Sequence, residues 1–278
     1  MDAGLEQIVA AETVLSDVQG AEGRLIIRGK DVEDLAQTFG FEETAHHLWS
    51  GFFEKNLSVV ELKAALGKAR VAAFERLKPD FDRLKTLPEV EALRTALALT
   101  FDGHDLDDAI DLAATTAVAS GAIARLKAGL APLPPEAHAR HGADLLRMIR
   151  GDTPSPREAR ALDAYLVTIS DHGLNASTFV SRCVASTRAG LGSAVIAALS
   201  ALKGPLHGGA PGPVLDMLDD IGEADHAESW IRTALERGDR LMGFGHRVYR
   251  TRDPRADMLK HVVQTLPASS GRLALAQS

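Results

Sequence analysis

The stretch "LDDAIDLAATTAVASGAIARLKAG", residues 106–129, is rich in small residues and nearly apolar throughout. A helix that is apolar on every face is buried, because only neighbouring elements can cover all of its sides. Alanine and leucine dominate the apolar residues of the whole chain, and aromatic residues make up only 5%. This composition favours helices over sheets. The stretch therefore predicts a buried central helix in a helical protein of 278 residues.

Further helix patterns lie on both sides of this stretch. Ser58 and Glu61 have the spacing of a capping box, and Ser155 and Glu158 repeat it. Helices are predicted within residues 31–39, 41–51, 58–66, 88–100 and 151–170, and a buried helix pair within residues 175–204. The β-rich runs at residues 13–18 and 24–29 form the only convincing strand pair. The predicted fold class is all-α with a small N-terminal β-hairpin.

A break rich in glycine and proline at residues 207–213 divides the chain into two predicted domains. Residues 1–206 are predicted to form a large helical domain. Beyond the break, three shorter and more polar helices fit a smaller domain of residues 207–278. A cleft between two domains is a common place for ligands.

Charge and cysteine content exclude several classes of function. The formal net charge of −7 argues against a general nucleic-acid surface. The single cysteine, Cys183, excludes an internal disulfide, and its helical context predicts a small buried filler rather than a nucleophile. Residues 1–10 lack the pattern of a signal peptide, and the apolar runs are predicted to be too short to cross a bilayer. These observations predict a cytoplasmic protein without a membrane partner.

Three histidines, His172, His207 and His246, lie beside glycine at predicted helix ends. His207 stands in "LKGPLHGGAPGPV", residues 202–214, where glycines and prolines interrupt regular structure. Neutral imidazoles suit reactions in which negative charge develops on a carbonyl oxygen, because one ring can donate a hydrogen bond to it while another protonates a ketone. A carboxylate base is still needed to remove a carbon-bound proton, and these segments contain no obvious candidate. The alternative for one such histidine is a loop side chain in solvent.

The remaining histidines do not share this context. His138 and His141 have a spacing that could bind a metal ion, but no third ligand is evident. A solvated helix face is therefore predicted for them, and no metal site.

A basic segment follows His246. The residues "GFG" at 243–245 supply backbone amides that could receive an adenine or phosphate edge. Four guanidinium groups come next, those of Arg247, Arg250, Arg252 and Arg255. Arginine matches carboxylate and phosphate oxygens in two-point contacts, so this cluster in an acidic protein indicates an anionic ligand. The alternative is a solvated basic helix start. No P-loop and no Rossmann glycine pattern is present.

Four segments in this order resemble the citrate synthase family, which includes the 2-methylcitrate synthases. They are "RLIIRGKDVEDLA" (24–36), "DHGLNASTFVSR" (171–182), "LKGPLHGGAPGPVLDML" (202–218) and "GFGHRVYRTRDPRA" (243–256). The resemblance runs from about residue 4 to the end of the chain. It implies a two-domain helical homodimer that condenses acetyl-CoA or propionyl-CoA with oxaloacetate, through an enol and hydrolysis of the acyl-CoA adduct. It also implies that acyl-CoA is a co-substrate and that no cofactor is permanently bound.

The resemblance also assigns roles to residues. His207 is expected to stabilise the enol of the thioester, and His246 to polarise and protonate the ketone of oxaloacetate. His172 and Arg255 are expected to bind oxaloacetate. The expected supporting and CoA-binding residues are Asn175 and Ser177 near the substrate and the enol-stabilising histidine, Gly243, Phe244 and Gly245 in the adenine loop, and Arg250 at a CoA phosphate.

Departures from the family pattern qualify these roles. Pro211 and Gly212 follow "HGGA" and Met242 precedes "GFGH", where the family has other residues, and no reacting group is lost. The Asn-Val-Asp/Glu-Phe-type segment that carries the catalytic aspartate is not found in the 278 residues, nor are the later substrate arginines and the returning helices of the large domain. The sequence is therefore expected to be part of a longer chain and to be inactive, or nearly so, as it stands.

Other functions remain open at this point. A paralogue that binds CoA and oxaloacetate, or dimerises, without turnover would keep the same contacts. A citryl-CoA lyase would use the same fold for a cleavage, the reverse of the condensation. A helical metal hydrolase is the remaining alternative. The choice between acetyl-CoA and propionyl-CoA is not determined, since one methylene is worth only about 1–3 kcal/mol.

Overall fold

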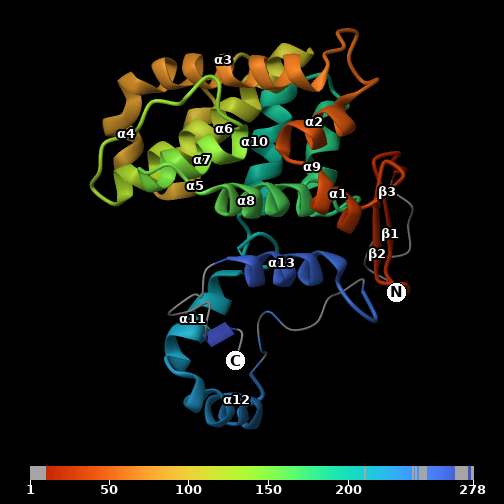
Figure 1. Cartoon of the computed structure of the whole chain (residues 1–278), viewed down its shortest axis with the longest axis vertical. Helices are drawn as coiled ribbons and strands as arrows, with labels where there is room; N and C mark the ends of the chain where they lie inside the picture. The colour runs from red at the N-terminus through yellow and green to blue at the C-terminus, as the bar shows by residue number, and fades with distance from the viewer. Residues whose placement is uncertain are drawn as a thin grey trace.

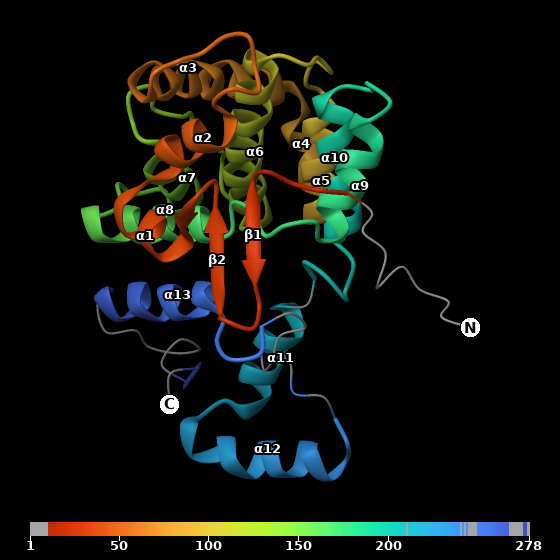
Figure 2. The same ribbon diagram turned by 90° about the vertical axis from the view of Figure 1, so that its right-hand side faces the viewer.

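A small antiparallel sheet opens the described part of the chain. The computed structural model describes residues 11–209, 211–239, 241, 243, 249–266 and 275–276. Strands β1 (Ser16–Gln19) and β2 (Arg24–Ile27) pair in the predicted hairpin, with Ser16 opposite Ile27. The chain then reverses at Arg28 and Gly29, which both have positive φ, and adds the short strand β3 (Lys30–Asp31). The hairpin prediction is confirmed (Figure 2), and β3 adds one more strand to the sheet (Figure 1).

Helices form most of the remaining structure, which confirms the all-α class. They are α1 (Val32–Thr38), α2 (Phe41–Trp49), α3 (Val59–Leu77), α4 (Phe81–Thr86), α5 (Glu89–Leu97), α6 (Leu106–Lys127), α7 (His141–Arg150), α8 (Pro156–Thr168), α9 (Ala176–Ala185), α10 (Leu191–Leu202), α11 (Pro211–Ile221), α12 (Ala227–Glu236) and α13 (Pro254–Thr265), with short 3-10 turns at Lys78–Asp80 and Ala224–His226. Both predicted capping boxes are present, at Ser58 and at Ser155. They begin α3 and α8 because each serine accepts from a backbone amide that the helix leaves unpaired.

Helix α6 is the central helix that residues 106–129 predict. It packs against α3, α5 and α7 (Figure 1). Val118 and Ile123 of α6 join Phe74 and Leu77 of α3 and Met148 of α7 in one apolar cluster. Helix α6 is also long and apolar enough to cross a membrane by length and composition, so the prediction that no run reaches this length is wrong. Of its most apolar 18-residue window, 61% is buried inside the protein, as in a core helix.

A second apolar cluster joins the sheet to α1, α8 and α13. Leu25 and Ile27 of β2 pack with Leu35 of α1, Val167 of α8 and Met258 of α13. Helix α13 therefore packs on the part of the chain before residue 207, whereas α11 and α12 lie away from it (Figures 1 and 2). The division into residues 1–206 and 207–278 stays a prediction.

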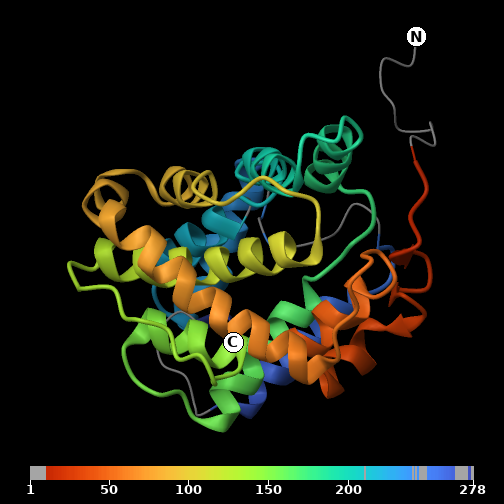
Figure 3. The same ribbon diagram turned by 90° about the horizontal axis from the view of Figure 1, so that it is seen from above.

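The pair α9–α10 corrects two expectations. The pair was expected to be buried, yet α9 contains no buried residue and α10 buries only Gly192 and Ala194. Cys183 is exposed rather than a buried filler. The two helices pack on each other and, through α10, on α5, and they lie together at one edge of the helical assembly (Figure 3). An apolar pattern indicates a face that favours burial, but it does not show whether the same chain covers that face.

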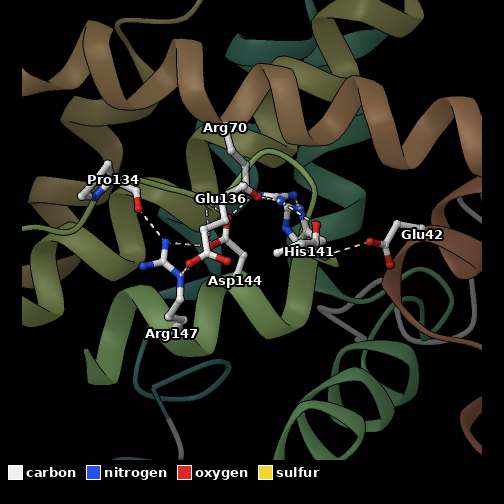
Figure 4. Close-up of polar contacts among 8 residues, drawn as sticks. Glu42, Arg70, Pro134, Glu136, His141, Asp144 and Arg147 are labelled. Carbon is white, nitrogen blue, oxygen red and sulfur yellow. Dashed lines mark hydrogen bonds and ion pairs between the residues drawn. The ribbon is translucent and has the colours of Figure 1, made fainter. Parts of the chain in front are cut away.

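A buried polar network joins α3 to α7 (Figure 4). The fully buried Arg70 donates from Nε to Asp144 at 2.8 Å. Asp144 also accepts from the backbone N–H of Glu136 and from Arg147. Nδ1 of His141 accepts a hydrogen bond from the Arg70 guanidinium at 3.3 Å. The backbone amide of His141 donates to the carboxylate of Glu42 at 2.8 Å. His141 is only 3% exposed, so the predicted solvated face is wrong for this residue.

Beside this network, Asp163 of α8 is a buried carboxyl group that faces Glu42, Arg140 and Arg160. Burial, and secondly Glu42, raise its pKa from 3.8 to about 6. Between these values the folded protein keeps a proton that the unfolded chain has lost, so stability falls as the pH rises. We therefore expect the titration of Asp163 to lower the free energy of unfolding by about 2 kcal/mol as the pH rises from 4.5 to 7.

Asp163→Asn removes this titration and keeps the acceptor for the Phe41 amide. Urea unfolding at the two pH values should show the wild type losing about 2 kcal/mol relative to this variant as the pH rises. Asp82→Asn, on the exposed face of α4, is the matched control and should follow the wild type. Parallel pH profiles for Asp163→Asn and the wild type would contradict the prediction.

Candidate active site

The first predicted site segment, residues 171–178, contains the end of the loop between α8 and α9 and the first residues of α9. Asn175 is the N-cap of α9, and its Oδ1 accepts from the Thr178 amide at 3.0 Å. Gly173 has a φ of +65°, and its amide donates to Ser16 Oγ at 2.9 Å. A positive φ is readily adopted only by glycine, so the turn holds this loop against β1. The loop places His172 before the cap and Ser177 within the first turn of α9.

His207 lies in the turn that ends α10. The amide of Gly208 donates to the carbonyl of Leu202 at 2.8 Å, and that of His207 to Gly204 at 3.0 Å. A Cβ on Gly208 would lie 2.6 Å from the Leu202 carbonyl oxygen, so a side chain there would require the turn to shift. The glycines predicted to interrupt the helix therefore set the direction of the His207 backbone.

These two segments meet through Ser177. Its hydroxyl oxygen lies 3.0 Å from Nε2 of His207 and 2.8 Å from Oδ1 of Asn175. The hydroxyl has one proton and can donate to one of these atoms at a time. When it donates to His207, the neutral ring carries its own proton on Nδ1. The structure thus brings His207, Ser177 and Asn175 together.

A second group of side chains forms around Tyr249. The Tyr249 hydroxyl lies 3.1 Å from Nε2 of His172, and the two rings are 5.6 Å apart at 64°. The guanidinium of Arg255 lies 5.7 Å from the centre of the Tyr249 ring and pairs with Asp253 at 2.7 Å. His172 and Arg255, which are 83 positions apart, are thereby brought to the same buried tyrosine. Sequence reasoning missed Tyr249, because one aromatic residue in a basic run has no diagnostic pattern.

The structure describes only some of the remaining predicted site residues. His246, Phe244 and Gly245 lie outside the described residues, as does Arg247. Gly243 has a φ of +87°, and a Cβ there would lie 3.3 Å from Val214 of α11. Arg250 is exposed, and its amide donates to the carbonyl of Gly20 at 2.9 Å.

Two arginines of the basic cluster form ion pairs with carboxylates of the same chain. Arg252 binds Glu33 at 2.7 Å and Asp257 at 3.0 Å, and Arg255 binds Asp253. Arg252 therefore joins α13 to α1 through two carboxylates. Arg247 lies outside the described residues, so Arg250 and Arg255 are the described arginines to which the anionic-ligand interpretation still applies. In the part of the chain that the structure describes, no group of three or more His, Cys, Asp or Glu side chains is arranged to hold a metal ion. The prediction of no metal site is not tested by this observation.

Comparisons with known proteins agree with the resemblance. The family model for "Citrate synthase, C-terminal domain" matches residues 4–277. Citrate synthase 2 of Bacillus subtilis is 36% identical over 280 residues, covering 96% of this chain and 74% of that protein. The 2-methylcitrate synthase of Mycobacterium tuberculosis is 33% identical over 276 residues, covering 94% of this chain and 68% of that protein.

Solved structures show the same relationship. Citrate synthase from Thermotoga maritima superposes with a TM-score of 0.84 at 33% identity and covers all of this chain and 76% of that one. The Thermoplasma acidophilum citrate synthase in a ternary complex with carboxymethyl coenzyme A and oxaloacetate gives a TM-score of 0.79 at 27% identity, covering 94% of this chain and 71% of that one. With the helical fold and the His207–Ser177–Asn175 arrangement, these matches show that the chain belongs to the citrate synthase family.

Proposed function

We propose that this chain serves the condensation of acetyl-CoA with oxaloacetate, with His207 as the residue that stabilises the enol. The contact of His207 Nε2 with Ser177 Oγ at 3.0 Å carries this proposal. When the serine hydroxyl donates to Nε2 rather than to Asn175 Oδ1, Nδ1 carries the ring proton and is the donor available to the thioester carbonyl oxygen. A positioned donor at that oxygen stabilises the charge that develops as the enol forms.

The oxaloacetate site is proposed around His172 and Arg255. A guanidinium forms strong two-point contacts with a carboxylate, and oxaloacetate has two carboxylates. A substrate carboxylate would compete with Asp253 for Arg255. His246, outside the described residues, is proposed to protonate the ketone, and Arg250 and residues 243–245 to bind CoA. Hydrolysis of the adduct would then release CoA and citrate.

The 278 residues contain no counterpart of the family's Asn-Val-Asp/Glu-Phe segment. We therefore propose that this polypeptide by itself binds substrates but removes the acetyl proton poorly. A general base contributes about 10²- to 10⁴-fold to a rate. Propionyl-CoA is the second candidate acyl donor, supported by the similarity to a 2-methylcitrate synthase.

A homodimer through α9 and α10 is also proposed. Phe179, Val195 and Leu202 expose more than a third of their surface on this apolar pair. A contiguous apolar surface favours association, and a second copy supplies a self-complementary partner. Sedimentation should show twice the monomer mass of 29.6 kDa.

Oxaloacetate binding and thiol release test the proposal separately. We expect the wild type to bind oxaloacetate in calorimetry, and Arg255→Gln to bind it about 10- to 100-fold more weakly, because a hydrogen bond to a charged group contributes about 1.5–3 kcal/mol. Arg157→Gln, at an exposed position in the first turn of α8, is the matched control and should bind as the wild type does.

Thiol release from acetyl-CoA should be about 10²- to 10⁴-fold slower than that of the Bacillus subtilis relative. Equal rates would contradict the proposed lack of a base. Absence of oxaloacetate binding would contradict the site. Acetyl-CoA formation from citryl-CoA would favour a lyase.

A further inference from the structure

We propose that Tyr249 is a positioning residue for His172: its hydroxyl donates to Nε2 and keeps the ring proton on Nδ1, directed to the 2-oxo dicarboxylate substrate. This inference rests on the proposed function, because it assigns His172 to the oxaloacetate site. It adds a residue whose part in that site neither the sequence motifs nor the comparisons indicate.

The contact joins two distant segments. Tyr249 lies within the basic segment, before α13 begins, and His172 lies in the loop that connects α8 to α9. Their 3.1 Å contact and the 64° angle between the rings direct the hydroxyl at the edge nitrogen rather than at the ring face. Tyr249 is 6% exposed, so packing holds its ring in place.

The direction of the hydrogen bond follows from the chemistry of the two groups. Burial raises the pKa of Tyr249 to about 12, so the phenol keeps its proton at neutral pH. The nearby Arg255 acts in the opposite sense and Asp253 in the same sense, both as smaller causes. An imidazole nitrogen is a much better acceptor than a phenol oxygen, and a phenol O–H is the more acidic donor. The neutral pair therefore forms with Tyr249 donating to Nε2.

This arrangement determines which atom His172 offers to a ligand. In a neutral imidazole one nitrogen donates and the other accepts, and the hydrogen bond at one nitrogen selects the role of the other. With Nε2 accepting, Nδ1–H is a donor, which suits the carboxylate and ketone oxygens of oxaloacetate. Without the hydroxyl, Nε2 loses the donor that favours this tautomer, and we expect a larger part of the population to present an acceptor to the substrate.

Tyr249→Phe removes only the hydroxyl. We expect it to weaken oxaloacetate binding about three- to tenfold, the effect of one lost hydrogen bond. Long-range ¹H–¹⁵N NMR of the imidazole should show His172 protonated on Nδ1 in the wild type and as a mixture of tautomers in the variant. His172→Gln identifies the resonances. The chain's other tyrosine, Tyr165, is exposed on α8, and Tyr165→Phe should match the wild type in both measurements.

The two readouts separate the possible failures. A wild-type His172 protonated on Nε2 would overturn the inference without any variant, so it can be tested even if Tyr249→Phe does not fold. An unchanged tautomer in Tyr249→Phe would also overturn it, whether or not binding weakens. If the tautomer changes as expected but the wild type binds no oxaloacetate, the contact is as described and the proposed function fails, together with the role assigned to it.

Discussion

Replacing Asp144 with alanine is expected to lower the free energy of unfolding by about 3–5 kcal/mol. Both Arg70 and Asp144 have side chains that are 0% exposed. Without the carboxylate, the Arg70 charge stays buried with only a histidine nitrogen and the backbone carbonyls of Glu136 and Ala139 as partners. Removing one member of a buried ion pair is costly because the remaining charge can neither be paired nor reach water.

Urea unfolding at pH 7 measures this loss. Asp239→Ala is the control, because its ion pair with Arg237 is more than half exposed and should be worth less than about 1 kcal/mol. The double variant Arg70→Met/Asp144→Leu should recover part of the stability, since apolar residues of similar size leave no uncompensated charge. A loss in Asp144→Ala as small as that in Asp239→Ala would contradict the structural role of the network.

Acidification is the second large effect, and it acts through His141. Burial, and secondly the charge of Arg70, lower the pKa of His141 from 6.5 to about 3. Below pH 6.5 the unfolded chain takes up a proton that the folded protein does not bind until about pH 3. Stability is therefore lost as the pH falls through this window, and we expect His141 to account for about 3 kcal/mol between pH 7 and pH 4.

The variant His141→Gln isolates this contribution. Glutamine keeps an acceptor for Arg70 but has no proton to gain, although it gives up the stacking of His141 on Phe41 at 4.0 Å. Its unfolding free energy should fall about 3 kcal/mol less than that of the wild type between pH 7 and pH 4. Asp163 has the opposite pH dependence and is present in both proteins, so it cancels in the comparison. Equal losses in both proteins would show that His141 does not stay neutral in the fold.

Local patterns were sufficient for the elements themselves. The capping boxes at Ser58 and Ser155 begin helices where predicted, and the two β-rich runs form the hairpin. These features depend on residues three or four positions apart or on a tight turn, so the neighbouring sequence contains all the information required. The apolar run at residues 106–129 identified the central helix for the same reason.

The surroundings of single side chains were harder to predict. His141 and Cys183 were each assigned from the pattern of their own segment, and both assignments are wrong. His141 is buried because Arg70, 71 positions earlier, requires polar partners in the core. Cys183 is exposed because the other described residues leave the outer side of α9 uncovered.

The fold and the candidate site show the same difference between what local sequence determines and what tertiary packing determines. Sequence by itself determined the fold class, the helix starts and the family, because caps, periodicity and motifs are local properties of the chain. Only the tertiary structure decided that Ser177 contacts His207, that Arg252 forms an ion pair with Glu33, and that Tyr249 contacts His172. Such contacts depend on how helices and loops far apart in the chain pack together, and no local pattern encodes that geometry.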